Sequence, residues 1–160
     1  MVSDLKISKV IPAEKSQVFS YMTRRELVEQ WSAPEGMTLN IPQFEAKAGG
    51  KYRYEHSSKE GVFICEGFFK EIVPNEKIVS VETGMGPDGK VMFMGLECIT
   101  TLKTVPGGTE FTVIQRGFSN EEMRQNCDQG WTQCLNKLSN LLNSSTGYRP
   151  SSESVREQFL

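Results

Sequence analysis

Apolar and polar residues alternate along most of the chain, at the spacing of two that is typical of half-buried strands. Near the N-terminus, Leu5 and Ile7 alternate with lysine and serine until Pro12 ends the run. Later stretches with a strand pattern, separated by turns rich in glycine and proline, are 37–41, 51–56, 62–73, 77–83, 91–105 and 109–118. Pro42 restricts its strand to a sheet edge or a bulge, and Gly95 indicates a bulge or a bend.

Helical spacing of apolar residues occurs in two places. Between residues 12 and 31 it predicts two short helices with a break near Thr23. A long helix is predicted from Ser119 to about Leu142, with Ser119 as N-cap and Glu122 completing a capping box. The apolar sector of this long helix consists of Met123, Cys127, Gly130, Trp131, Cys134, Leu135, Leu138, Leu141 and Leu142.

The predicted order is a strand, two short helices, about six further strands and one long helix, which is typical of an α+β domain and excludes a parallel βαβ sheet. A strongly curved antiparallel sheet can wrap around the last helix, and the apolar face of that helix then packs against the sheet. A chain of 160 residues suits one domain, predicted at 1–142. Residues 143–160 are rich in serine and charge, so we expect a flexible C-terminal tail.

Composition and charge exclude several classes of partner. A net charge of -2 and a pI near 5.6 give no basic surface for nucleic acid. The N-terminal stretch lacks the apolar core of a secretory signal, and no run is long enough to insert into a membrane. We therefore expect a cytoplasmic protein, monomeric or homodimeric, whose four cysteines are reduced core thiols.

Neither a metal nor a cofactor is expected. The cysteines and the single histidine, His56, show no CxxC or HxxxH spacing, and the glycine pairs precede no helix that binds phosphate. His56 is a poor acid–base candidate without a second histidine or a spatially indicated acid, and we expect it to approach a solvated loop. The strand carboxylates Glu45, Glu55, Glu66 and Glu97 are interpreted as a solvated face.

A few polar groups could orient a ligand in an apolar cavity. Tyr52, Tyr54 and His56 share one strand face, an arrangement suited to that role. Met92 and Met94 beside Gly95 could form an adaptable wall or fill the core. Phe63, Cys65 and Phe69 share one face of their strand and Ile64 and Phe68 the other, and alternation does not decide which is inward.

Five segments then carry a family resemblance: VIPAEKSQVFSYMT, LVEQWSAPEGMT, FEAKAGGKYRYE, GFFKEIVPNEKIV and FSNEEMRQNCDQGWTQCLNKLSNLL, in this order over about residues 5–142. Together they resemble the Aha1-type family (activator of Hsp90 ATPase homologue 1-like) of the START/Bet v 1-like (SRPBCC) superfamily. The resemblance implies a helix-grip fold, with about six to seven curved antiparallel strands around the C-terminal helix and an elongated apolar cavity between them. Many relatives have a second tryptophan where this chain has Ser32.

Gly130 raises a question of its own, because glycine inside a helix costs about 1 kcal/mol relative to alanine. It is explained equally by a ligand that comes close to the helix and by packing of Trp131 against a strand. With the cavity implied by the resemblance, Trp131 fills one end and the small thiols leave room. The predicted cavity residues are Trp31, Tyr52, Tyr54, His56, Phe63, Cys65, Met92, Met94, Met123, Cys127, Gly130, Trp131 and Cys134.

These features predict non-catalytic binding of a small hydrophobic or amphipathic molecule, lipid-like or aromatic. Whether the protein is an enzyme is left open, and no catalytic residue is assigned. One alternative, which the superfamily resemblance implies, is a cyclase or hydrolase in which Tyr52, Tyr54, His56 or Arg116 polarises a carbonyl. The other is a co-chaperone-like interaction module with a chaperone partner, which would need a large exposed apolar patch on the outer face of the sheet. The short helices before Trp31 are expected to gate the cavity.

Overall fold

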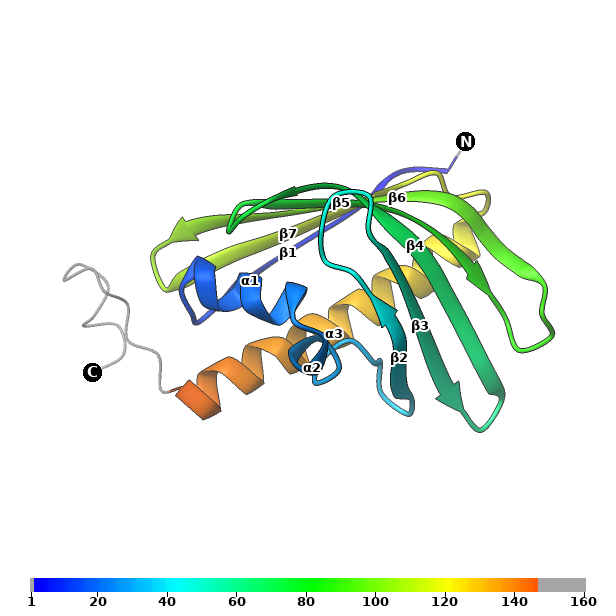
Figure 1. Ribbon diagram of the computed structural model, residues 1–160, viewed down its shortest axis with the longest axis horizontal. Coiled ribbons are helices and arrows are strands. Elements are labelled where there is room, and N and C mark those ends of the chain that lie inside the picture. Colours follow the sequence, from blue (N-terminus) through cyan, green and yellow to red (C-terminus); the bar gives the residue numbers. More distant parts are fainter. Residues whose placement is uncertain (1, 147–160) are drawn as a thin grey trace.

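Seven antiparallel strands form one curved sheet in the computed structural model, which describes residues 2–146 (Figure 1). The strands lie in the order β1-β7-β6-β5-β4-β3-β2, and the sheet arches over the long C-terminal helix α3. This is the predicted α+β helix-grip fold. The elements are β1 Leu5–Ile11, α1 Lys15–Thr23, α2 Arg25–Val28, β2 Thr38–Phe44, β3 Lys51–Ser58, β4 Gly61–Val73, β5 Lys77–Met85, β6 Val91–Val105, β7 Gly108–Arg116 and α3 Glu121–Thr146.

The irregular points of the sheet fall where the sequence predicts them. Pro42 lies in β2, an edge strand, and the pairing of β2 with β3 shifts register between Asn40 and Gln43. Proline has no N–H for a ladder, so an edge with a bulge is where a strand tolerates it. Gly95 has a φ of 68° and lies in β6 where the pairing with β5 changes register. A left-handed residue there creates the bulge.

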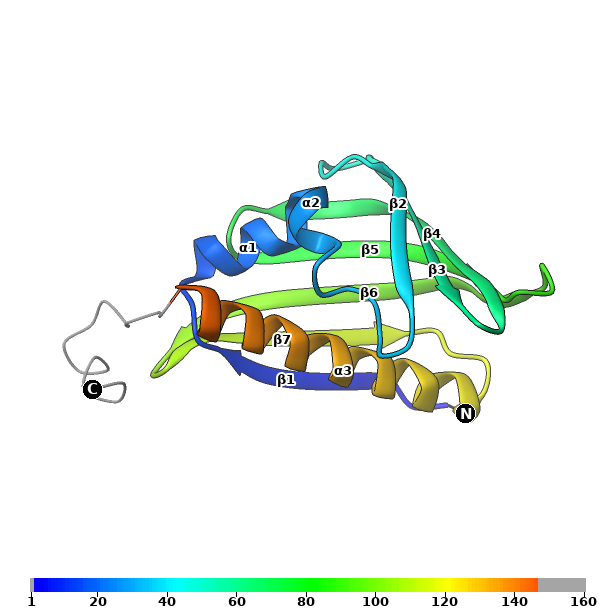
Figure 2. The same ribbon diagram turned by 90° about the horizontal axis from the view of Figure 1, so that it is seen from below.

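The helices close the concave side of the sheet (Figure 2). Helix α3 runs along β1, and α1 and α2 lie beside it across the other strands. The main core forms between α3 and the sheet, where Leu135 and Leu138 meet Phe111 and Val113 of β7, all at most 1% exposed. Because each strand buries alternate residues against α3, the sheet can remain polar on its other face.

Both ends of α3 differ from the prediction. The backbone N–H of Met123 donates to Oδ1 of Asn120 at 2.8 Å, so Asn120 caps the helix and the capping box predicted at Ser119 is wrong. Asparagine and serine are about equally good N-caps, so composition alone did not separate the two neighbours. The helix continues past Leu142 to Thr146. The rest of the predicted tail, residues 147–160, lies outside the described residues.

None of the helices within residues 2–146 has the length and the apolar character needed to span a membrane.

Candidate ligand-binding cavity

A cavity of about 290 Å³ lies between the concave face of the sheet and α3. Its walls come from β3 to β7, from α3 and from the segment around α2 that includes Trp31 and Pro34. Most of the lining is aliphatic, aromatic or sulfur-containing. Cavities that bind small molecules are usually apolar with a few polar groups, and this volume lies close to the lower end of their usual range of roughly 300–1,000 Å³.

The structure brings most of the predicted site residues together around this cavity. Those that line it are Trp31, Tyr52, Tyr54, His56, Phe63, Cys65, Met92, Cys127, Gly130, Trp131 and Cys134. Met94 does not, because the bulge at Gly95 turns it outward and leaves it 70% exposed. Met123 does not either, because it packs with Leu5, Leu96 and Phe118 in a separate apolar cluster.

The inward face of β4 is now decided. Phe63, Cys65 and Phe69 line the cavity, whereas Phe68 is 42% exposed on the opposite face. Ile64, between Phe63 and Cys65, also contributes to the lining. Alternation could not settle this orientation because both faces of the strand carry large apolar side chains.

Three aromatic rings form one wall. Trp31 lies 6.0 Å from Phe111 and 6.3 Å from Trp131, and Phe111 and Trp131 are 6.1 Å apart, measured between ring centroids. Trp31 is 4% exposed, and its Nε1 donates to the carbonyl oxygen of Tyr21 at 2.8 Å. The hydrogen bond satisfies the indole N–H and fixes the ring, so this wall is preformed.

A carboxyl group, Glu82 of β5, lies among these apolar residues and is the main feature that the sequence prediction missed. The hydroxyl of Tyr52 donates to its Oε2 at 2.9 Å, and Sγ of Cys65 donates to the same oxygen at 2.7 Å. Burial raises the pKa of Glu82 above its ordinary value, and the hydrogen bonds from Cys65 and Tyr52 oppose that shift in part. Burial, followed by the nearby carboxylate, likewise raises the pKa of Tyr52 and of Cys65.

Gly67 makes this contact between alternate strands possible. In the register of the sheet, Gly67 of β4 pairs with Tyr52 on one side and with Glu82 on the other. A Cβ at Gly67 would lie 2.6 Å from the Tyr52 hydroxyl oxygen and 2.5 Å from the carbonyl oxygen of Val81. Only a residue without a side chain therefore lets the Tyr52 ring cross β4 and reach Glu82.

His56 lines the cavity and also contacts the loop that follows α2. Its Nε2 is 3.0 Å from the carbonyl oxygen of Ser32. A carbonyl oxygen only accepts, so Nε2 carries the proton and donates. Burial lowers the pKa of His56, and the hydrogen bond to Ser32 partly offsets this. The neutral ring joins β3 to the segment that follows α2.

All four cysteines line the cavity as free thiols. Burial raises the pKa of Cys127 and of Cys134 to about 12, and raises that of Cys98 as well. A nucleophilic cysteine needs a lowered pKa, so these thiols are poor nucleophiles at neutral pH.

No three His, Cys, Asp or Glu side chains of residues 2–146 are grouped so that they could hold a metal ion.

Gln115 of β7 is a second polar group that the prediction missed. It is 2% exposed and lines the cavity, and its Oε1 has no hydrogen-bond partner among the described residues. Ser80 and Thr100 add hydroxyl groups to the same lining. Strand alternation places Ile78, Ser80 and Glu82 on one face of β5. The sequence did not show that this face is the inward one, so Glu82 was not predicted.

Gly130 has open space in front of it. A Cβ at this position would meet only Cγ of Pro34, at an ordinary contact distance of 3.7 Å. No strand atom lies within 4 Å of that position, so close approach of a strand does not explain the glycine. The remaining space belongs to the cavity, which Gly130 lines.

The segment from Ser32 to Glu35 is tied to α3 as well as to His56. The backbone N–H of Glu35 donates to Oε1 of Gln133 at 3.0 Å, and Nζ of Lys137 donates to the carbonyl oxygen of Ala33 at 2.8 Å. These bonds hold one rim of the cavity against the helix.

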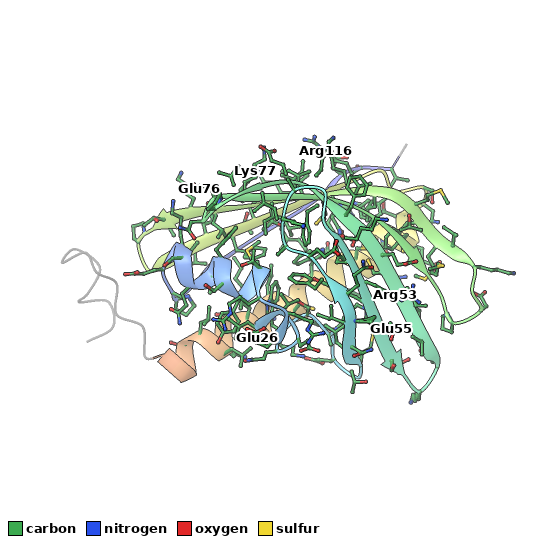
Figure 3. All side chains as sticks on the ribbon, viewed as in Figure 1. Glu26, Arg53, Glu55, Glu76, Lys77 and Arg116 are labelled. Atoms are coloured by element: carbon green, nitrogen blue, oxygen red, sulfur yellow. The ribbon has the colours of Figure 1, made fainter. Side chains whose placement is uncertain are left out.

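The strand carboxylates named in the sequence analysis lie on the outer face or in turns. Arg53 of β3 pairs with Glu55 at 3.1 Å and with Glu66 at 2.9 Å. Arg116 binds Asp4 at 3.2 Å, and Figure 3 shows it with Lys77 on the convex side, away from α3. Arg116 therefore cannot polarise a group inside the cavity, and that part of the enzyme alternative is wrong.

Comparison with known proteins agrees with this architecture. Residues 12–143 match the family described as activator of Hsp90 ATPase homolog 1-like protein. No curated protein matches the chain. The protein CV1439 from Chromobacterium violaceum has a TM-score of 0.76 at 22% identity, covering 88% of this chain and 97% of that one. The AHSA1 protein from Silicibacter pomeroyi has a TM-score of 0.76 at 18% identity, with 89% and 99% covered. At these identities the likeness shows the fold alone.

Proposed function

Because the chain belongs to the family of activator of Hsp90 ATPase homolog 1-like proteins and has an apolar cavity between its sheet and α3, we propose that it binds a small hydrophobic or amphipathic molecule without catalysing a reaction. The cavity of about 290 Å³, walled by the Trp31, Phe111 and Trp131 rings, carries this proposal. An apolar cavity of about 150 Å³ already admits benzene, so there is room here for a molecule with two fused rings. Burial of apolar area supplies the affinity, at roughly 25 cal/mol per Å².

The chemistry of the lining supports binding over catalysis. The thiols have raised pKa values and the histidine is neutral and hydrogen-bonded to Ser32. Arg116 lies outside. A general acid or base needs a suitable pKa and a position beside the reacting atom, and Glu82 alone supplies only one such group.

The outer face gives little support for a chaperone partner. Large apolar residues that are exposed occur in β1, β4 and β6, and ion pairs of Arg53, Lys70 and Arg116 lie on the same surface. Single exposed apolar residues are normal on monomers, whereas docking surfaces are contiguous. A cytoplasmic location stays part of the proposal, and the free thiols support it.

A titration with naphthalene, an uncharged two-ring probe, tests the function. We expect the amide signals of residues 127–134 to shift in NMR spectra of the ¹⁵N-labelled full chain, with saturation at one equivalent. Gly130→Leu fills the space in front of Pro34 and should abolish the shifts while the fold is kept. Gln129→Leu adds the same side chain on the exposed face and serves as the matched control. Undiminished binding to Gly130→Leu, or no binding to either protein, would contradict the proposal.

A further inference from the structure

The charges around the cavity restrict what the inner end of a ligand can be, provided that the proposed function holds. Among the described residues that line the cavity there is no lysine and no arginine, and Glu82 carries the only carboxyl group. On α3, Lys137 uses its ammonium group to bind the carbonyl oxygen of Ala33. A carboxylate, sulfate or phosphate on the ligand would be buried beside Glu82 with no counter-charge, which is strongly unfavourable.

The two oxygens of Glu82 are used unequally. Oε2 accepts from both Tyr52 and Cys65, and no described residue forms a hydrogen bond with Oε1. Gly67 leaves room for the Tyr52 ring, so the hydrogen bond to Oε2 forms without a ligand. The open oxygen in this apolar wall is therefore Oε1.

Gln115 supplies a second unpaired polar group in the same lining. In the sheet, Gln115 pairs with Cys98 of β6, and Cys98 pairs with Ser80 of β5. Ser80 lies two residues before Glu82, on the same face of β5. Because β6 lies between them, β7 and β5 are two strand spacings apart, roughly 10 Å, so Gln115 contributes to the same lining at some distance from Glu82. Oε1 of Gln115 is covered in the structure, and a turn of the amide about its last torsion is needed to present it.

A hydroxyl group satisfies this wall whichever form Glu82 adopts. If the carboxyl group is ionised, Oε1 only accepts, and the hydroxyl donates to it. If the proton is on Oε1, the hydroxyl accepts from it. We propose that the cavity selects an apolar molecule with a neutral hydroxyl group, phenolic or alcoholic, which binds Oε1 of Glu82, and that it rejects ligands with an anionic group at that end.

Four probes with one ring system test the proposal by NMR or calorimetric titration of the full chain at pH 7: naphthalene, 2-naphthol, 2-naphthoate and 2-naphthylmethylammonium. We expect 2-naphthol to bind roughly 2- to 10-fold more tightly than naphthalene, the range of one net hydrogen bond. We expect 2-naphthoate to bind more weakly than naphthalene. The shifts that only 2-naphthol causes should lie at residues 65–67 and 80–84.

Variants at one position separate a hydrogen bond from general packing. Glu82→Leu should lose the preference for 2-naphthol while naphthalene still binds. Glu82→Gln, whose amide both donates and accepts, should keep the preference. The control Glu97→Gln changes a carboxyl group on the outer face, where Lys70 and Arg116 lie, and should behave as the wild type.

The outcomes distinguish the two proposals. Equal binding of naphthalene and 2-naphthol by the wild type overturns the hydroxyl inference and leaves the cavity function intact. Tighter binding of 2-naphthoate, or of the ammonium probe, also overturns it, because a charged group would then be preferred. If none of the four probes binds, the proposed function itself fails. The wild-type comparison stands even if Glu82→Leu does not fold.

Discussion

Glu82 is the residue whose environment differs most from what its type would predict. Carboxylates on strands are usually solvated, and a carboxyl group faces the interior only when hydrogen bonds compensate in part. Here Tyr52 and Cys65 donate to one oxygen, and Gly67 makes room for the contact. Tyr52, Gly67 and Glu82 lie on three different strands, so the site depends on the register of the sheet.

Glu82→Gln should change the pH dependence of stability. Burial raises the pKa of Glu82 above 4.5 in the folded state, so its contribution is fully present below that pH and is lost as pH rises through the folded pKa. Glutamine does not titrate. The free energy of unfolding, measured with urea, should therefore rise for the variant relative to the wild type as pH increases. A constant difference at all pH values would show that Glu82 is not buried in this way.

Gly130→Ala should stabilise the protein by about 0.5–1 kcal/mol. Alanine is the better helix former by about that amount, and the added methyl group meets only Pro34, at 3.7 Å. The midpoint of urea unfolding should rise, and probe binding should weaken as the cavity becomes smaller. A destabilised variant would mean that the backbone at Gly130 needs freedom that the structure does not show.

At the scale of elements, the cavity rim depends on a few bonds between α3 and the segment after α2. Lys137 and Gln133 bind this segment at Ala33 and Glu35, and His56 of β3 binds it at Ser32. The helices themselves are anchored, since Val18 is fully buried and Val28 is 2% exposed. We therefore expect any opening of the cavity to occur at residues 32–35 and not in α1 and α2.

Lys137→Met should loosen this rim while the aliphatic part of the side chain still packs. Loss of the bond to the Ala33 carbonyl should speed amide hydrogen exchange in residues 32–37 several-fold, with little change in the β-sheet. Ligand release should be faster too. If α1 and α2 exchange as fast as residues 32–37, the gate would lie in the helices after all.

The helices and strands were largely predictable from the local pattern of residues. Which face of each strand points toward α3 was not. Alternation identified the strands, and Pro42 and Gly95 identified their irregular points, because these signals are local. The inward face of β4 was not predictable, since Phe68 and Phe69 are equally apolar. Glu82 and Gln115 were missed because only the pairing of distant strands turns them toward α3.

For the whole molecule, the four thiols report on the state of the cavity. All of them line it, and with pKa values of about 12 for Cys127 and Cys134 only a very small fraction is thiolate at pH 8. We expect slow reaction with an aromatic disulfide reagent in the native protein and fast reaction of four thiols in guanidinium chloride. Bound 2-naphthol should slow the native reaction further. Fast native labelling would indicate that the cavity is open to bulky reagents.

The central claim is that the molecule holds a small, neutral, hydroxyl-bearing apolar compound between its sheet and α3. Native mass spectrometry of the protein isolated from its own cells tests this most directly, with Gly130→Leu isolated in the same way for comparison. The account predicts an added mass of one small molecule on the wild type, absent from the variant, whose released compound contains a hydroxyl group and no acid. A carboxylic acid or phosphate ester in that position, or the same added mass on Gly130→Leu, would contradict it.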